Sequence, residues 1–142
     1  MRYKIFLDSN ILISGIFYSG LENFLLKQDF IFITSDVNYN EVLEVAKRKS
    51  KKFGDKIVSI ALEKVRESFL DMEIIKEREW SSKLDEASKY IKGQNDRKIL
   101  AAVLLSNPDY FITNDKDFHT SAIKKLIKAI KTRELLEELN LL

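Results

Sequence analysis

The sequence predicts an α/β fold, a three-layer α/β/α sandwich built on a central, mostly parallel five-stranded sheet. Short apolar runs rich in β-branched and aromatic residues alternate along the chain with longer segments that have helical spacing. The chain has only 1 proline and 4 glycines, so it lacks the frequent turns of an all-β protein. Its 142 residues, 45% of them hydrophobic, are enough for one domain with a substantial core. We therefore expect a single domain over residues 1–142.

Five segments have the composition of buried strands, because they are short, apolar and bounded by polar or turn-forming residues. In chain order they are residues 5–7, 30–34, 72–75, 110–113 and 127–130. The segments between them and after the last have helical character, at residues 10–17, 21–27, 37–49, 55–69, 82–91, 95–104 and 132–139. Ser35 is expected to cap the third helix, and Gly93 to stop the fifth. Strands that alternate with helices favour parallel pairing with helices on both faces of the sheet.

The composition excludes several classes of protein and of site. With 0 cysteines and His119 as the single histidine, a disulfide framework, a thiolate nucleophile and a Cys- or His-rich metal site are excluded. No run approaches the roughly 20 apolar residues of a membrane span, so we expect a cytoplasmic protein without membrane contact. The 24 basic and 22 acidic residues give a net charge of +2, which excludes a histone-like arm. A nucleic-acid enzyme stays possible, because it needs a basic patch rather than a basic total.

Five acidic residues follow the expected strands or lie near the start of the helices beside them. They are Asp8, Glu41, Asp96, Asp115 and Asp117. In an open parallel sheet the ligand site lies at the carboxyl ends of the strands, where the strand order reverses. If strands 5–7 and 110–113 are neighbours at that point, the carboxylates of these residues converge on one cleft.

Converging carboxylates repel one another and raise one another's pKa, and a divalent cation offsets this repulsion. Oxygen ligands without His or Cys favour Mg²⁺ or Mn²⁺, which suits hydrolysis of a phosphodiester by metal-activated water. Each acid also has a purely structural interpretation. Asp8 and Asp96 would serve as helix caps, Glu41 as a solvated helix acid, and Asp115 and Asp117 as ordinary loop residues. The argument for a metal site rests on their joint placement.

The segments that carry these acids resemble the PIN-domain nucleases, the fold of many bacterial and archaeal VapC-type toxins. The matching segments are residues 6–14, 34–35, 96–102 and 109–118, together with Glu41. The first contains Asp8-Ser9-Asn10 after a strand, similar to the family's Asp-Thr/Ser-Asn, and the last two are the most specific. The resemblance covers most of the chain.

The resemblance implies roles for eight residues. Asp8, Glu41, Asp96 and Asp115 match the family's catalytic, metal-binding acids, Asp117 matches an additional acid of some members, and Ser9, Asn10 and Thr113 match polar positions around them. It further implies an endoribonuclease that depends on Mg²⁺ or Mn²⁺ and is the toxin of a toxin–antitoxin pair. The implied partners are an RNA substrate, a cognate antitoxin and a second copy of the chain.

Other interpretations of the same residues remain open. A housekeeping RNA-processing PIN nuclease, or a PIN-fold module that only binds partners, would share these motifs.

Other families with acids at strand ends match less well. A phosphoacceptor receiver domain needs paired acids after its first strand, but in this chain Asp8 is followed by Ser9. A haloacid-dehalogenase-type phosphatase needs a second Asp where Asn10 stands, and a Toprim-type nuclease normally has Glu as its early acid.

Two surface features are relevant to partners. Five cations fall between Lys47 and Lys52, and we interpret them as a solvated helix end in preference to a phosphate contact. The predicted helices also carry more apolar residues than one small core needs, which favours a homodimer. These residues are Leu21, Phe24, Leu25, Ile57, Ile60 and Val65.

Overall fold

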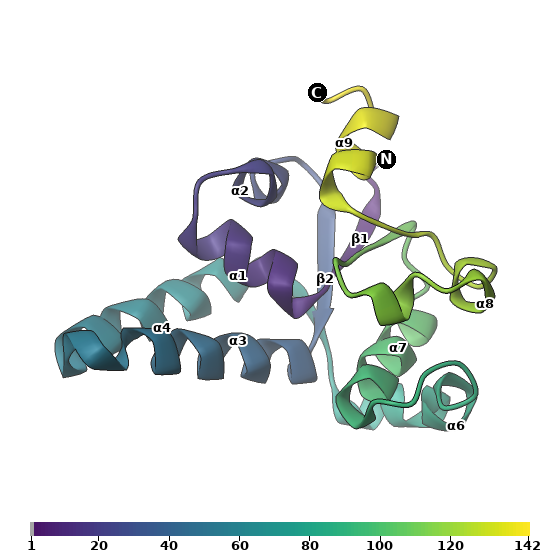
Figure 1. Cartoon of the computed structure of the whole chain (residues 1–142), viewed down its shortest axis with the longest axis horizontal. Coiled ribbons are helices and arrows are strands. Elements are labelled where there is room, and N and C mark those ends of the chain that lie inside the picture. Colours follow the sequence, from purple (N-terminus) through teal and green to yellow (C-terminus); the bar gives the residue numbers. More distant parts are fainter. Residues whose placement is uncertain (1) are drawn as a thin grey trace.

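A computed structural model describes residues 2–142 and has a central sheet of five strands (Figure 1). The strands are β1 (Lys4–Leu7), β2 (Ile31–Ser35), β3 (Glu73–Ile75), β4 (Tyr110–Ile112) and β5 (Ala129–Ile130). Their spatial order is β3-β2-β1-β4-β5, and all four pairings are parallel. The predicted sandwich is confirmed, with a sheet that is wholly rather than mostly parallel.

Helices cover both faces of the sheet, so that the molecule has three layers (Figure 1). One face packs against α1 (Ser9–Phe17), α2 (Leu21–Leu26), α3 (Asp36–Ser50), α4 (Asp55–Phe69) and α9 (Thr132–Glu138). The other face packs against α5 (Glu77–Trp80), α6 (Leu84–Ala87), α7 (Gln94–Ser106) and α8 (Ser121–Lys124). None of the helices within residues 2–142 combines the length and the apolar character that crossing a membrane requires.

Each central strand contributes to both cores, because successive side chains point to opposite faces. Ile5 and Leu7 of β1 lie in the core beneath α1 and α3, whereas Phe6 lies in the core beneath α7. In β4, Ile112 belongs to the first core and Phe111 to the second. Strands buried on both faces have continuous apolar runs, which is the pattern that the sequence shows.

The order of the strands reverses between β1 and β4. From β1 the chain moves outward to β2 and β3 with α1 to α4 on one face, then returns across the other face through α7 to β4. Leu7 is paired with Ile112 at the carboxyl ends of these two strands. The next residues, Asp8 and Thr113, therefore leave the sheet side by side, which meets the condition for the acids to converge.

The predicted helix over residues 82–91 is wrong. That region instead holds a 3₁₀ helix (Ser81–Lys83), the single turn of α6 and an irregular segment. The hydroxyl of Ser82 donates to the carbonyl of Glu79, and the hydroxyl of Ser88 donates to that of Leu84. Such side-chain bonds compete with the backbone bonds of a continuous helix. Two further helices that the sequence did not predict, α5 and α8, have four residues each.

The apolar residues assigned to a dimer surface differ in their burial, and Leu21 is partly buried against the core of the monomer. Leu25 and Val65 are fully buried in the core of the monomer, so their assignment to an exposed surface was wrong. Phe24, Ile57 and Ile60 are exposed, and Ile60 keeps 55% of its surface accessible.

Replacement of Phe111 by Ala should strongly destabilise the fold. Phe111 has no exposed surface and packs edge-on against Phe6 and Phe118, with ring centroids 5.5 and 5.0 Å away. We expect Phe111→Ala to lower the free energy of unfolding by about 3–5 kcal/mol in urea denaturation. The matched control is Phe53→Ala, because Phe53 is 64% exposed and should change stability little. Equal losses in the two variants would contradict this packing.

Candidate metal centre

Asp8 is a buried carboxylate that links the first strand to its neighbours at the carboxyl edge of the sheet. Only 6% of its surface is exposed. Its Oδ2 accepts a hydrogen bond of 2.6 Å from the hydroxyl of Thr113, and its Oδ1 accepts one of 2.8 Å from the amide of Ser9. Asp8 thus caps α1 and at the same time joins the ends of β1 and β4.

A chain of side-chain hydrogen bonds connects Asp8 to Glu41 on α3. The side-chain nitrogen Nδ2 of Asn38 donates to Asp8 Oδ1 at 3.2 Å and to the hydroxyl of Ser9 at 2.8 Å. The hydroxyl of Ser9 donates in turn to Glu41 Oε1 at 2.7 Å. Ser35 caps α3 by accepting from the main-chain amide of Asn38, and its hydroxyl donates to Asn38 Oδ1. The cap therefore fixes the orientation of the Asn38 amide.

The loop after β4 is organised by Thr113. Its hydroxyl donates to Asp8 and accepts a bond of 3.0 Å from the amide of Asp115. Asp115 then caps a 3₁₀ helix (Lys116–Phe118) by accepting from the amide of Asp117 at 2.9 Å. Nε2 of His119 donates to the carbonyl of Thr113 at 2.8 Å, which closes the loop from the other side. Thr113 therefore positions the acids that follow two neighbouring strands, Asp8 after β1 and Asp115 after β4.

Asp96 reaches the site from the first turn of α7, and its side chain lies against Gly93. A Cβ atom built on Gly93 would lie 2.7 Å from Asp96 Oδ2, a distance that side chains do not tolerate. The Asp96 carboxylate therefore occupies the space that a side chain at position 93 would fill. Gly93 has φ −58° and ψ 133°, a conformation open to any residue, so a larger residue here would act by displacing the Asp96 carboxylate rather than by straining the backbone.

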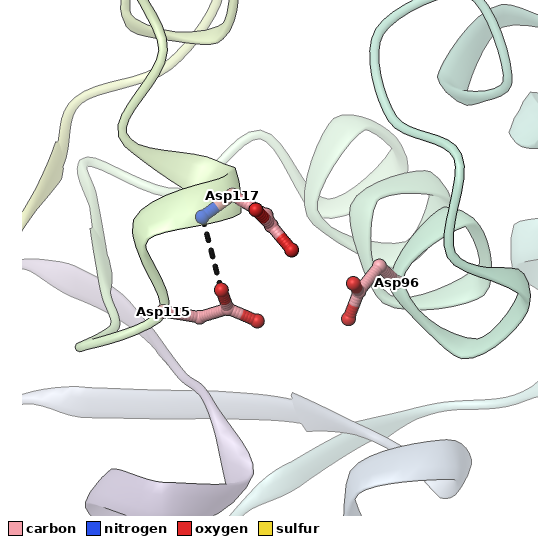
Figure 2. A group of neighbouring side chains, drawn as sticks. All are labelled: Asp96, Asp115 and Asp117. Carbon is pink, nitrogen blue, oxygen red and sulfur yellow. Dashed lines mark hydrogen bonds between the residues drawn. The ribbon is translucent and has the colours of Figure 1, made fainter.

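Asp96, Asp115 and Asp117 form a compact group of carboxylates. Each offers one oxygen, and these three oxygens all lie within 4.8 Å of one another. Figure 2 shows the side chain of Asp96 pointing from α7 toward Asp115 and Asp117, which lie on the segment that follows β4. Asp8 and Glu41 lie at the same edge of the sheet, outside this group of three.

Electrostatic repulsion couples all five acids. The pKa of Asp96 is raised to about 6, first by burial and then by the charges of Asp115, Asp8, Asp117 and Glu41, in that order of importance. The pKa of Asp8 is also raised, chiefly by burial, while its hydrogen bonds from Thr113 and Ser9 act in the opposite direction. The protein thus holds several like charges together at a free-energy cost. A cation bound among them would lower that cost.

The donor set fits a hard divalent cation. The three grouped residues offer only carboxylate oxygens, the ligands that Mg²⁺ and Mn²⁺ favour. Asp115 and Asp117 come from one short loop, whereas Asp96 comes from a helix, so the group combines ligands from two elements.

The structure brings seven of the eight residues singled out in the sequence to one site. The exception is Asn10, which is exposed on the first turn of α1. The asparagine that contacts Asp8 is Asn38, which the sequence analysis missed. A signal for it was present, because Asn38 lies four residues before Val42 and eight before Ala46 on the buried stripe of α3. A polar residue on such a stripe needs a partner.

Comparison with known families identifies the class of protein. The family described as PIN domain matches residues 5–124. The chain therefore belongs to the PIN domain family, a family of nucleases. A search of curated proteins found no significant match.

Solved structures that share the fold include two of VapBC proteins. The first is a crystal structure of VapBC2 from Rickettsia felis bound to a DNA fragment from their promoter, with a TM-score of 0.62 and 18% identity. That match covers 90% of this chain and 98% of the other. The second is VapBC-1 from nontypeable Haemophilus influenzae, with a TM-score of 0.62, 15% identity, and coverage of 92% and 98%. At such identities the likeness is one of fold.

Asp96→Asn should stabilise the metal-free protein at neutral pH. The raised pKa means that the folded state holds the proton of Asp96 more tightly than the unfolded state does. The stability contributed by the protonated form is therefore lost as the pH rises through about 6. After allowance for solvent screening we expect a gain of about 1 kcal/mol at pH 7.5, or about 2–4 °C in Tm, shrinking toward pH 4.

Thermal denaturation with and without Mn²⁺ tests this expectation. Mn²⁺ should raise the Tm of the wild type more than that of Asp96→Asn. Asp71→Asn is the control, because Asp71 is exposed at the opposite end of the sheet, just before β3. An equal Mn²⁺ response in wild type and Asp96→Asn would exclude Asp96 from the metal site.

Gly93→Ala should weaken metal binding without unfolding the protein. The new Cβ must displace the Asp96 carboxylate, whereas the backbone at Gly93 is free of strain for alanine. We expect Mn²⁺ affinity, measured by calorimetry, to fall about tenfold or more. Gly20→Ala is the matched control, since its added Cβ meets no atom within 4 Å. Unchanged affinity in Gly93→Ala would contradict the role given to this glycine.

Proposed function

We propose that residues 1–142 form one PIN domain that acts in the cytoplasm as a divalent-metal-dependent endoribonuclease, the toxin of a toxin–antitoxin pair. The observation that carries the proposal is the gathering of five acids at the switch point of a parallel sheet, three of them with oxygens within 4.8 Å. This is where α/β proteins of this architecture bind their ligands. Membership in a family of nucleases supports hydrolysis as the reaction.

The residues that would hold Mg²⁺ or Mn²⁺ are Asp96, Asp115 and Asp117, with Asp8 and Glu41 beside them. When bound, such an ion would supply Lewis-acid activation of a water molecule and charge stabilisation at a phosphodiester. The protein itself supplies orientation. Thr113 and Asn38 hold the carboxylate of Asp8, and Ser9 holds that of Glu41. Because these groups are fixed before substrate binds, little reorganisation is needed during the reaction.

A protein partner is supported by an exposed apolar groove on the side of the molecule away from α7. The groove lies between α1, α3 and the start of α4, and its lining includes Phe17, Tyr18, Phe53 and Ile57. Tyr18 and Phe53 keep 58% and 64% of their surfaces exposed. Contiguous exposed apolar residues mark interaction sites. The two solved structures described above are of VapBC proteins, so we propose a cognate antitoxin as the partner. The homodimer stays a prediction.

The alternative functions differ in their expected behaviour. A module that only binds partners has no need of converging acids, and all five are present here. A housekeeping RNA-processing nuclease would share the site but would not require an antitoxin. A gene for a small inhibitory protein next to this gene would favour the toxin.

RNA cleavage that depends on the acids tests the proposal. We expect single-stranded or structured RNA to be cut in the presence of Mg²⁺ or Mn²⁺, and Asp8→Asn and Asp115→Asn each to reduce the rate at least about a hundredfold, because each removes a carboxylate from the site. Product analysis on gels gives the rate, and circular dichroism shows that the variants are folded. Asp71→Asn serves again as the control and should cleave like the wild type. Full activity in either site variant would overturn the assignment.

A further inference from the structure

A hollow adjoins the metal centre on the side of α6 and α7. It is lined by Ser88, Lys89, Tyr90, Ile91, Lys92, Gly93, Asp117 and Thr120. Its volume of about 490 Å³ lies within the range of small-ligand sites. None of the roles assigned above involves Lys89, Tyr90 or Lys92.

The hollow is continuous with the metal centre through two residues. Asp117 belongs both to the group of three carboxylates and to the lining of the hollow. Gly93 also lines the hollow, and the carboxylate of Asp96 lies against it. A ligand seated in the hollow therefore lies next to the acids, so that one end of an extended ligand reaches them.

The wall formed by residues 89–93 is held in place. Nε of Arg97, from the first turns of α7, donates to the carbonyl of Ile91 at 3.1 Å. The side chain of Ile91 is 7% exposed and belongs to the core beneath α7. This irregular segment is thus tied to the same helix that carries Asp96, and its distance from the acids is set by that helix.

The chemistry of the lining favours a single-stranded nucleic acid. Lys89 and Lys92 are exposed, and none of the ion pairs formed among residues 2–142 uses either of them. Tyr90 is half-buried and presents the rest of its side chain to the hollow. Cations that contact phosphates, combined with an aromatic ring for a base, are the elements with which proteins bind single strands.

We propose that this hollow holds the nucleotide of a single-stranded RNA that flanks the scissile phosphate. Lys89 and Lys92 contact its backbone phosphates, and Tyr90 packs against its base. The inference rests on the proposed function, since it takes the acids as the cleavage site. Beyond that function, the proposal states that the RNA runs from the acids toward α6, and it names the residues that hold the RNA there.

Binding of a fluorescein-labelled ten-nucleotide RNA, followed by anisotropy, tests the proposal. The measurements are made in the full-length Asp96→Asn background, so that binding is observed apart from cleavage. Replacing Lys89 and Lys92 together by Ala should raise the Kd about tenfold or more near 0.1 M salt. The plot of log K against log salt should also become shallower by about 1.4, because each phosphate contact on a single strand contributes about 0.7.

The control for the lysines is Lys27→Ala. Lys27 is exposed at the end of α2, before β2 begins, at the opposite end of the sheet from the acids. Its replacement should leave both the Kd and the salt dependence unchanged. If the double lysine variant behaves like Lys27→Ala, the proposal is wrong.

Two variants of Tyr90 test the contact with the base. Tyr90→Phe keeps the ring and should bind RNA like the parent, whereas Tyr90→Leu keeps apolar packing without the ring and should raise the Kd about fivefold or more. Equal binding by the two variants would overturn the contact. An unlabelled glutamate oligomer that competes as well as unlabelled RNA would show a general anion or acidic-peptide site instead.

The proposal and the proposed function fail in different ways. If the wild type cleaves RNA but the double lysine variant binds RNA unchanged, the RNA-binding role of the hollow is wrong and the proposed nuclease function stands. If RNA binding depends on Lys89 and Lys92 but the wild type shows no metal-dependent cleavage, the hollow binds RNA and the proposed nuclease function is wrong.

Discussion

The buried carboxylate of Asp8 is the constraint on which the rest of the site depends. It lies between β1 and β4, where the strand order reverses, and it accepts hydrogen bonds from elements far apart in the sequence. A buried carboxylate without donors would cost several kcal/mol. The need to satisfy it therefore positions Thr113, and through Thr113 the loop that carries Asp115. On the other side it positions Asn38 and Ser9, which in turn hold Glu41.

The same arrangement creates a charge imbalance within a chain of nearly balanced composition. The 22 acids and 24 bases give only +2 overall, yet five acids lie together, and burial with the charges of the other four raises the pKa of Asp96 to about 6. A bound divalent ion would offset this local excess, so a modest number of nearby lysines would suffice to hold an RNA strand. Near-neutral composition is therefore compatible with a nuclease, because the local field rather than the total decides binding.

Much of the fold follows from patterns that are local in sequence. Strands buried on both faces need continuous apolar runs, and the residues at their carboxyl ends are the next ones in the chain, so Asp8 and Asp115 were found directly. The cap at Ser35 was equally local, since a hydroxyl bonds to an amide three residues later. The segment at 82–91 was mispredicted because its apolar spacing favours a helix, whereas the chain there forms a 3₁₀ helix, the single turn of α6 and an irregular segment packed on α7.

The sequence by itself determined the alternation of strands and helices and the five acids that end beside the sheet, because both depend on short-range periodicity. Only the tertiary structure decided which polar groups contact these acids. Asn38 and not Asn10 contacts Asp8, because α3 packs with its buried stripe toward β1. Gly93 makes room for Asp96, and Arg97 holds the wall of the hollow beside it, because a loop is folded onto α7. These contacts depend on the distances between packed elements, which no local pattern encodes.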